Sequence, residues 1–389
     1  MLEILFLLLP FAAAYGWYMG YRSAQHDKQK QSHQISRQYV AGLNLLLSDQ
    51  SDKAVDHFIE LLQVDDDTID THLALGNLFR SRGEVDRAIR IHQNLISRSG
   101  LTIEQKNIAL QQLAKDYMAA GLLDRAEKIF EQLLDEPEHL ESALLQLVSI
   151  YQQTREWNKA IDCGRQLIKL GRKNMRQTIA HFICEQAVVA ESTGETSKAV
   201  SLYKKALSED ARCVRASIAL GKLHLNDGNY RGAIKHFEQV LDQDVDYVSE
   251  ILPLLNTCYG KVGEQQPWVD FLQRCIKANA GASAELMLAT LVAQHEGAPA
   301  ALDLMTKQLV NNPTMKGFYQ LMDYHLVDAE EGRAKDSLTA LREMVGVQLK
   351  VKPHYRCEKC GFATHSLYWQ CPSCKTWGDI KPIRGLDGE

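Results

Sequence analysis

One stretch decides the fold: GNLFRSRGEVDRA at residues 76–88, which returns in altered form as GKLHLNDGNYRGA at residues 221–233. Both stretches begin with glycine, end with alanine and carry a second glycine in between, at Gly83 and Gly228. A similar pair twelve positions apart occurs six times: Gly42 and Ala54, Gly76 and Ala88, Ala114 and Ala126, Val148 and Ala160, Ala187 and Ala199, and Gly221 and Ala233. The alanines that end these pairs follow one another at steps of 34, 38, 34, 39 and 34 residues.

A step of about 34 residues is the period of the tetratricopeptide repeat, in which each unit is a pair of antiparallel helices. Small residues let the two helices cross closely. The residues four positions after each alanine are mostly larger and would fill the gap to the next unit: Phe58, His92, Phe130, Gly164, Tyr203 and Phe237. One helix pair cannot bury its apolar face alone, so the units must stack. The sequence therefore predicts an all-α, superhelical tetratricopeptide-repeat solenoid rather than a generic helical bundle.

The predicted repeats lose their regularity along the chain. Residues 37–245 hold six clear units, and residues 246–350 hold degenerate repeats or capping helices. In the degenerate part Trp268 stands where a small residue is expected, and a last helix pair near 316–328 and 332–349 has apolar spacing without the repeat signature. Atypical units are expected where a solenoid ends.

Residues 1–21 predict an N-terminal transmembrane helix. Residues 2–19 are almost continuously apolar and just long enough to cross a hydrocarbon core. An aromatic collar and then a polar linker over residues 22–36 follow, with basic residues in excess: Trp17, Tyr18, Tyr21, Arg22, Lys28 and Lys30. A cleaved signal peptide needs basic residues before the apolar run, where Glu3 is the only charged side chain. The positive-inside rule predicts a single-pass protein with its N-terminus outside and its bulk in the cytoplasm.

Residues 351–389 form a separate rubredoxin-like, metal-binding module. Two Cys-x-x-Cys pairs, Cys357 with Cys360 and Cys371 with Cys374, can place four thiolates around one ion. Zinc and iron both accept this geometry, so the sequence leaves the metal open. A closed four-thiolate site has no open position and should be structural. His354 and His365 are interpreted as bystanders, and the five remaining cysteines as small buried hydrophobes in a reducing compartment.

Aromatic residues cluster in the same module: Tyr355, Phe362, Tyr368, Trp369 and Trp377. We expect them to supply apolar cover for a domain too small to hold itself without metal. From residue 350 onward there are seven Lys or Arg against four Asp or Glu, so a nucleic-acid knuckle is one alternative. Because the whole chain has a net charge of −5, we favour docking of the module onto the repeats and expect no nucleic acid partner.

Catalytic motifs are absent from the sequence. There is no Gly-rich phosphate loop, no Gly-x-Ser-x-Gly elbow and no His-Glu-x-x-His. With 389 residues, 45% of them hydrophobic, the chain is long enough for a large helical core. It is therefore predicted not to be an enzyme and to have no catalytic residues.

The first helix of each unit should line the binding face of the array. Candidate lining residues are Tyr39, Leu43, Leu73, Asn77, Arg80, Gln111, Lys115, Met118, Ser149, Gln152, Glu191, Lys222 and Leu225. Only Asn77, Lys115 and Lys222 resemble parts of the repeated lysine and asparagine set that clamps a chaperone's C-terminal carboxylate. The sequence therefore does not predict that ligand, and an ordinary solvated face is the alternative.

The combination of an N-terminal anchor, about nine tetratricopeptide-like units and the four C-terminal cysteines resembles the lipopolysaccharide assembly protein B family of Gram-negative bacteria. The resemblance covers essentially the whole chain, and the terminal cysteine motif is its most specific part. It implies an inner-membrane regulator, single-pass through residues 2–19, with a periplasmic N-terminus and a cytoplasmic soluble part. It also implies that the metal module packs on the repeats and is needed for activity.

The resemblance implies partners as well. The protein is expected to hand the lipid A deacetylase to the membrane-bound AAA+ protease FtsH, and its anchor to contact both the protease and an inner-membrane sensor protein. Further lipopolysaccharide synthesis or transport proteins are possible partners, and the sequence leaves a homodimer open. Two rival interpretations remain. One is a general envelope-assembly scaffold, and the other is a metal-dependent redox or nucleic-acid module carried on repeats.

Overall fold

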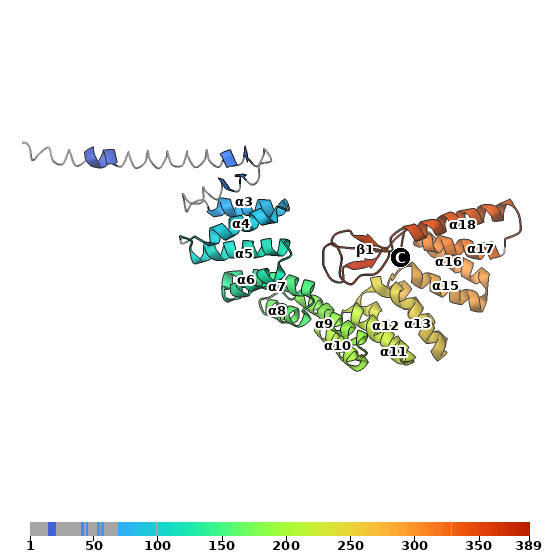
Figure 1. The fold of residues 1–389 in the computed structure, drawn as a ribbon. Helices are drawn as coiled ribbons and strands as arrows, with labels where there is room; N and C mark the ends of the chain where they lie inside the picture. The colour runs from blue at the N-terminus through green and yellow to red at the C-terminus, as the bar shows by residue number, and fades with distance from the viewer. Residues whose placement is uncertain are drawn as a thin grey trace, which may run out of the picture. The chain divides into compact units, whose positions relative to one another are not determined.

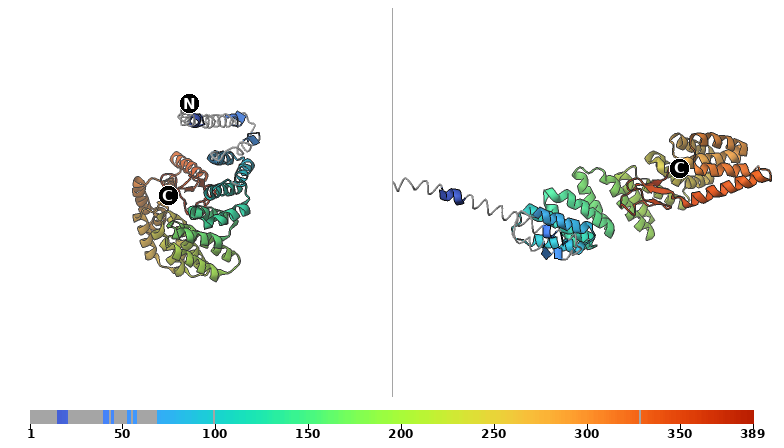
Figure 2. Two further views of the ribbon diagram at one scale, coloured as in Figure 1. Left: turned by 90° about the vertical axis from the view of Figure 1, so that its left-hand side faces the viewer. Right: turned by 90° about the horizontal axis from the view of Figure 1, so that it is seen from above.

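The computed structural model describes residues 15–20, 40–42, 44–45, 53–54, 56–57, 69–98, 100–327 and 329–389. The chain divides into two compact units, Met1–Thr154 and Arg155–Glu389. In both units, antiparallel helices joined by short turns pack side by side in sequence order (Figures 1 and 2). The predicted all-α repeat architecture is confirmed, with a small β-sheet added in the C-terminal module.

In the first unit, the small residues of the repeat signature lie where helices meet. The side chains of Ala88, Ala114 and Ala126 are completely buried. Gly76 shows why the position must be small, because a Cβ atom there would lie 2.4 Å from Nε2 of His92. The helices are α3 (Ile69–Ser81), α4 (Val85–Ile96), α5 (Ile103–Ala119), α6 (Leu123–Gln132) and α7 (Pro137–Thr154), with a short 3-10 helix η2 (Leu133–Asp135) before α7.

The second unit begins with helices that keep the same signature. A Cβ atom on Gly221 would lie 2.4 Å from the buried ring of Phe237. Gly194 and Gly228 have positive φ angles of 78° and 71° at the turns between the two helices of their pairs. These helices are α8 (Trp157–Lys169), α9 (Met175–Ser192), α10 (Thr196–Glu209), α11 (Val214–Asn226) and α12 (Tyr230–Gln243), followed by the 3-10 helix η3 (Val245–Tyr247).

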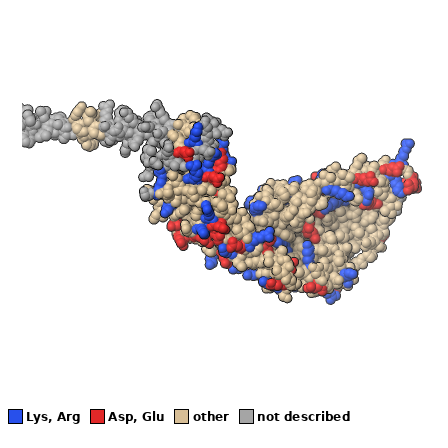
Figure 3. Space-filling model, in the orientation of Figure 1, with Lys and Arg blue, Asp and Glu red and all other residues tan. Residues whose placement is uncertain are grey.

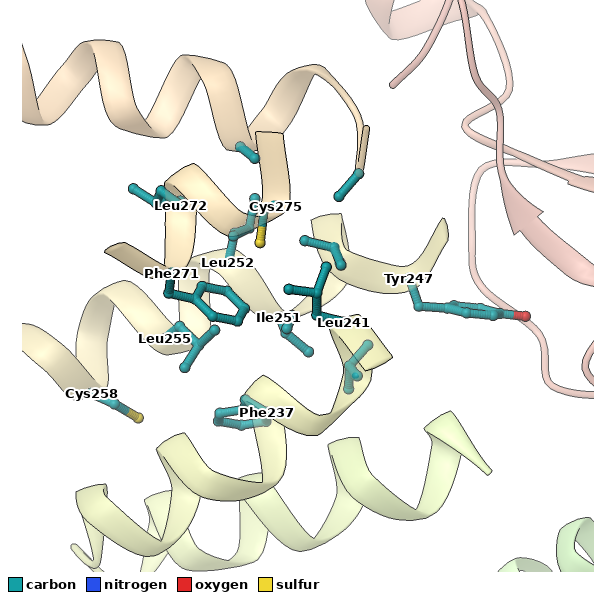
Figure 4. Close-up of a cluster of buried hydrophobic side chains, with 14 of the residues drawn as sticks. Phe237, Leu241, Tyr247, Ile251, Leu252, Leu255, Cys258, Phe271, Leu272 and Cys275 are labelled. Atoms are coloured by element: carbon teal, nitrogen blue, oxygen red, sulfur yellow. The ribbon is translucent and has the colours of Figure 1, made fainter. Parts of the chain in front are cut away.

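The remaining helices of the second unit are the degenerate ones. Trp268, which replaces a small residue, is buried and stacks on Tyr259 with ring centroids 5.3 Å apart. Both belong to a cluster of buried side chains that runs from α11 to α15, part of which is drawn in Figure 4. The helices are α13 (Val248–Val262), α14 (Gln265–Lys277), α15 (Ala282–Glu296), α16 (Ala298–Asn311), α17 (Met315–Val327) and α18 (Arg333–Val351).

The chain ends in a three-stranded antiparallel sheet with the order β2-β1-β3. Strand β1 (Tyr355–Cys357) pairs with β2 (Ala363–Thr364) on one side and with β3 (Ile380–Pro382) on the other. In this register Cys357 lies opposite Ile380, so the sheet joins the first cysteine pair to the last strand.

The predicted anchor over residues 1–21 and linker over residues 22–36 lie almost entirely outside the described residues. Residues 15–20 are helical, with the side chains of Trp17 and Tyr18 exposed. Within the parts of the chain that the structure describes, no helix has both the length and the apolar character needed to span a bilayer. Tyr39 and Leu43 of the predicted lining also lie outside the described residues, whereas Leu73 is buried.

Candidate metal centre

The four predicted cysteines are brought together by two similar turns. In the first, the Cys357 N–H donates to the carbonyl of Phe362 and the Gly361 N–H to that of Cys357, at 2.8 and 2.9 Å. In the second, the Cys371 N–H donates to the carbonyl of Thr376 and the Lys375 N–H to that of Cys371, at the same two distances. Each turn needs a left-handed residue four positions after its first cysteine. Gly361 supplies it in the first turn and Lys375, with φ 61°, in the second.

The sulfur positions fit a tetrahedral ion. Zinc–sulfur bonds of about 2.3 Å place the sulfurs of a tetrahedral site about 3.8 Å apart. The Sγ atoms of Cys357 and Cys374 are 3.7 Å apart, and those of Cys360 and Cys371 are 3.6 Å apart. All four lie within 4.8 Å of one another. In the described part of the chain, this is the one group of histidine, cysteine and carboxylate ligands with such spacing, and neither His354 nor His365 joins it.

The surroundings of the thiols differ. The Thr376 hydroxyl, 3.1 Å from the sulfur, is the largest cause that lowers the pKa of Cys374, to about 6. Burial raises the pKa of Cys371 to about 11. Cys357 and Cys371 are buried beside Ile380, Tyr355 and Phe362, whereas Cys360 is exposed. Each turn therefore contributes one buried thiol, and Cys371 is the one that a bound cation would have to keep ionised.

The module docks on the repeats through Trp377, three residues after the last cysteine. Its ring is 8% exposed and stacks on His181 of α9, with centroids 5.3 Å apart. The rings of Phe182 and Trp157 meet it edge-on at 5.9 and 6.5 Å. The guanidinium of Arg215 lies over it at 5.9 Å. Trp377 therefore fills a socket made by α8, α9 and α11.

His181 forms the floor of this socket and is almost completely buried. Burial, followed by the nearby Arg215 guanidinium, lowers the pKa of His181 from 6.5 to about 3. The imidazole is therefore uncharged at neutral pH and can lie flat against the indole. Gly378 follows Trp377 with φ 72°, and a Cβ atom there would lie 3.1 Å from Nε2 of His181. Only a residue without a side chain fits this close approach without displacing the imidazole.

A second contact forms around Tyr247 at the end of η3. Its hydroxyl points away from the core cluster toward the C-terminal module (Figure 4). It lies 3.0 Å from the carbonyl oxygen of Gly378 and 2.9 Å from that of Ile380, to which it donates. Burial raises the pKa of Tyr247, so the donor keeps its proton. Trp369 stacks on the same ring with centroids 5.5 Å apart.

Charged pairs surround this contact. Lys381 is 2.9 Å from Asp246 and 3.1 Å from Asp244. Arg384 is 2.5 Å from Asp246, and the Tyr355 hydroxyl donates to Glu250 at 2.8 Å. Two basic residues of the module, Lys381 and Arg384, therefore face carboxylates of the repeats. The predicted docking of the module onto the helical array is confirmed.

The predicted role of the aromatic residues needs one correction. Tyr355 and Phe362 do pack beside the cysteines, but Trp369 and Trp377 face the helices, and Tyr368 is 46% exposed. His181 and Tyr247 could not be recognised from the sequence, because nothing in the repeat pattern marks them. The opposed charges of Asp244 and Asp246 against Lys381 and Arg384 were the one signal that could have found this interface.

The chain has relatives along its full length. The rubredoxin metal binding domain family matches residues 355–382, and tetratricopeptide repeat families match residues 71–102 and 192–256. Lipopolysaccharide assembly protein B of Escherichia coli strain K12 is 54% identical over 388 residues, covering 100% of both chains. The protein of the same name from Haemophilus influenzae is 46% identical over 391 residues, covering 98% of each. A crystal structure of MamA protein is 24% identical, covers 47% of this chain and 95% of its own, and has a TM-score of 0.33.

Proposed function

This chain belongs to the lipopolysaccharide assembly protein B family, and on that premise we propose that it is a non-enzymatic adaptor regulating lipopolysaccharide synthesis at the bacterial inner membrane. Residues 2–19 would anchor it by a single span, with the N-terminus in the periplasm and the repeats in the cytoplasm. The observation that carries the proposal is the full-length identity to relatives of that name, joined to a metal module packed on the helices.

Each part of the chain has a physical task in this role. An anchor confines the repeats to the membrane, which raises their effective concentration toward membrane partners. The first helices of the repeats present an extended surface to a client. We propose that the client is the lipid A deacetylase, that the protease FtsH receives it, and that an inner-membrane sensor protein relieves the degradation through the anchor.

The metal module would act as a structural clamp. Cys357, Cys360, Cys371 and Cys374 would hold one zinc or iron ion, which when bound ties the two turns together and keeps the thiolates ionised. The turn that contains Cys374 continues directly into Trp377. The position of Trp377 in the socket therefore depends on the fold of the metal site. Loss of the ion should therefore release Trp377 from α8, α9 and α11.

Surface charge supports a protein partner over a nucleic acid. On the face drawn in Figure 3, basic and acidic side chains are interspersed in each unit and do not gather into one basic patch. The pairing of Lys381 and Arg384 with carboxylates of the repeats uses part of the module's basic character internally. A nucleic-acid knuckle would need those charges free to meet phosphates.

The proposal is tested by following the half-life of the lipid A deacetylase after protein synthesis is stopped. Cells would carry the full chain, a chain lacking residues 2–19, or the Cys357→Ser/Cys360→Ser double variant. A Lys359→Ser/Ser373→Ala chain is the matched control, because it changes two exposed residues of the same turns and leaves every thiol. We expect fast decay only with the full chain and the control.

Equal half-lives in all strains would contradict the proteolytic role and favour the general envelope-assembly scaffold. Fast decay without residues 2–19 would contradict only the need for the anchor. The metal content of the purified chain, measured by elemental analysis, separates zinc from iron. A coloured, redox-active iron protein would favour the redox interpretation of the module.

A further inference from the structure

Two of the cysteines outside the metal centre lie in direct contact. Cys184 on α9 and Cys213 at the start of α11 are 29 residues apart in sequence, and their Sγ atoms are 3.9 Å apart. Both are free thiols, and they are 0% and 3% exposed. Cys258 and Cys275 are equally buried, but in the part of the chain that the structure describes no thiol lies within hydrogen-bonding distance of either. The contact therefore distinguishes one pair among thiols of similar burial.

The two sulfurs of this pair are not equivalent. Cys213 is the N-cap residue of α11, which places it at the positive end of the helix dipole. The Cys184 thiol is the largest cause that lowers the pKa of Cys213, and the nearby N–H of Ala216 in the first turn of α11 adds to it. The same contact, followed by burial, raises the pKa of Cys184 well above its usual value. The S–H of Cys184 therefore donates to the sulfur of Cys213, which is the more readily ionised thiol.

Cys213 is also the thiol that a small solute reaches most easily. It directly follows Ala211 and Arg212, which are both exposed in the turn between α10 and α11. A molecule of the size of hydrogen peroxide needs only a local opening of this turn to meet the sulfur. Cys258 and Cys275 lie inside α13 and α14, where the same approach requires a helix to open.

Two adjacent thiols and one peroxide give a balanced oxidation. The Cys213 thiolate attacks one oxygen of hydrogen peroxide, the O–O bond breaks, hydroxide leaves, and the sulfur becomes a sulfenic acid. The sulfur of Cys184 then attacks the sulfenic sulfur, so that the S–O bond breaks and an S–S bond forms. The proton of Cys184 leaves with the departing oxygen as water, and the proton released from Cys213 neutralises the hydroxide. Two thiols and one peroxide thus yield one disulfide and two waters.

The pair lies beside the socket that holds Trp377. Cys184 follows His181 by three positions, which places both on one face of α9, and Cys213 precedes Arg215 by two. His181 and Arg215 are the two groups that lie against the faces of the indole. An S–S bond of about 2.05 Å requires the sulfurs to approach by about 2 Å from their present 3.9 Å. Because α9 and α11 both form the socket, that approach would change its fit to the indole.

We propose that Cys184 and Cys213 are a site of reversible oxidation, which peroxide closes into a disulfide that loosens the docking of the metal module. In reducing compartments disulfides are rare, and those that form are mostly transient and redox-sensing. The inference goes beyond the proposed adaptor role and does not depend on it. For this pair alone, it replaces the interpretation of the scattered cysteines as inert, small buried hydrophobes.

The test treats the zinc-loaded full chain in detergent micelles with hydrogen peroxide for increasing times. Free thiols are then blocked with an alkylating reagent under denaturing conditions, and mass spectrometry of the digest identifies each cysteine as free, oxidised or linked. This readout separates the pair from the four metal ligands. Cys258 and Cys275 are the internal controls, because they are as buried as the pair.

We expect the peptides of Cys184 and Cys213 to be recovered linked to each other, and the link to disappear after reduction with a phosphine. Burial raises the pKa of Cys275 to about 12. Since the thiolate fraction changes about ten-fold with each unit of pKa, the pair should be oxidised at least about ten times faster than Cys275 or Cys258. Equal rates at the four thiols, or oxidation of Cys213 without a link to Cys184, would overturn the proposal. Neither comparison needs a variant to fold.

Amide hydrogen exchange of the same samples tests the effect on docking. Oxidation should accelerate exchange in residues 369–382 about five-fold, because the loss of one aromatic contact of Trp377 corresponds to about that factor. Cys184→Ala is the matched control, since it keeps every metal ligand but cannot close the link, and Cys213→Ala repeats the comparison from the other side of the pair. Unchanged exchange in the oxidised native chain, or equal acceleration in the peroxide-treated variants, would overturn the proposed effect on docking.

Discussion

The second unit contains two kinds of helical repeat that are held together differently. In α8 to α12 the two helices of a pair pack closely against each other. The ring of Phe237 lies directly against Gly221, and the side chains of Ala199 and Ala233 are completely buried. In α17 only Gly317 is buried, and among the described residues of α18 none is. The regular repeats therefore carry their own core, and the end helices do not.

The last residues of the chain form hydrogen bonds and an ion pair with the starts of the end helices α15 and α17. The Met315 N–H at the start of α17 donates to the carbonyl of Leu386 at 2.8 Å. The side chain of Glu389 accepts from the N–H and hydroxyl of Ser283 at the start of α15, at 2.9 and 2.7 Å, and also pairs with Lys316. The decay of a repeat signature can therefore be offset by contacts from a segment that is distant in sequence.

The largest expected effect comes from emptying the socket. Trp377→Ala removes a buried indole and should cost about 3–5 kcal/mol of local stability. The module would then be held by Trp369, Tyr247, the Tyr355–Glu250 hydrogen bond, the ion pairs and the tail. Amide hydrogen exchange should therefore accelerate most in α15 to α18 and least in α10 and α12. Hydrogen-exchange mass spectrometry of the full chain measures both regions at once.

Tyr368→Ala is the matched control for this change, because it removes an aromatic side chain of the same module that is 46% exposed. It should leave exchange in all helices nearly unchanged. If Trp377→Ala accelerated exchange equally in the regular and the end helices, the two kinds of repeat would share one cooperative core. That result would contradict the conclusion that only the regular repeats carry a core of their own.

The sequence predicted the regular repeats well and the interface only in outline. A small residue twelve positions before alanine reports a local crossing of two helices, so Gly76 and Gly221 could be assigned without a structure. The four cysteines carry a similarly local signal. The socket is different, since His181 and Trp377 lie far apart in sequence and meet only when the module docks. Nor could the sequence show that Arg80 of α3 pairs with the buried Asp116 of α5, because that contact depends on how the two helices pack.

A smaller effect is expected from pH, through His181. Its pKa is about 3 in the folded chain and 6.5 as a free group. Between these values the unfolded chain binds a proton that the folded chain does not, so stability falls as the pH decreases below about 6.5. At pH 5 the loss should be about 1–2 kcal/mol. Denaturant unfolding at pH 7.5 and pH 5, followed by far-ultraviolet circular dichroism, measures it.

His181→Phe keeps an aromatic ring against Trp377 and removes the titration. Between pH 7.5 and pH 5 the variant should lose about 1–2 kcal/mol less free energy of unfolding than the native chain, whatever its stability at pH 7.5. His365→Phe is the matched control, because that imidazole is exposed and its replacement should leave the pH dependence unchanged. An identical pH dependence in the native chain and His181→Phe would show that the socket does not hold the imidazole neutral.

The smallest effect tests the tail directly. Glu389→Gln keeps an oxygen for the N–H of Ser283 but removes the charge that faces Lys316 and the positive end of α15. Because the side chain is only 6% exposed, the loss should be about 1 kcal/mol, more than a surface ion pair gives. Asp387→Asn is the control, since its pairing with Lys352 is half exposed. Exchange should accelerate in the first turns of α15 and α17 with Glu389→Gln alone, and the regular helices should keep their protection. Equal behaviour of the two variants would mean that the backbone of the tail, and not the Glu389 carboxylate, fastens the end helices.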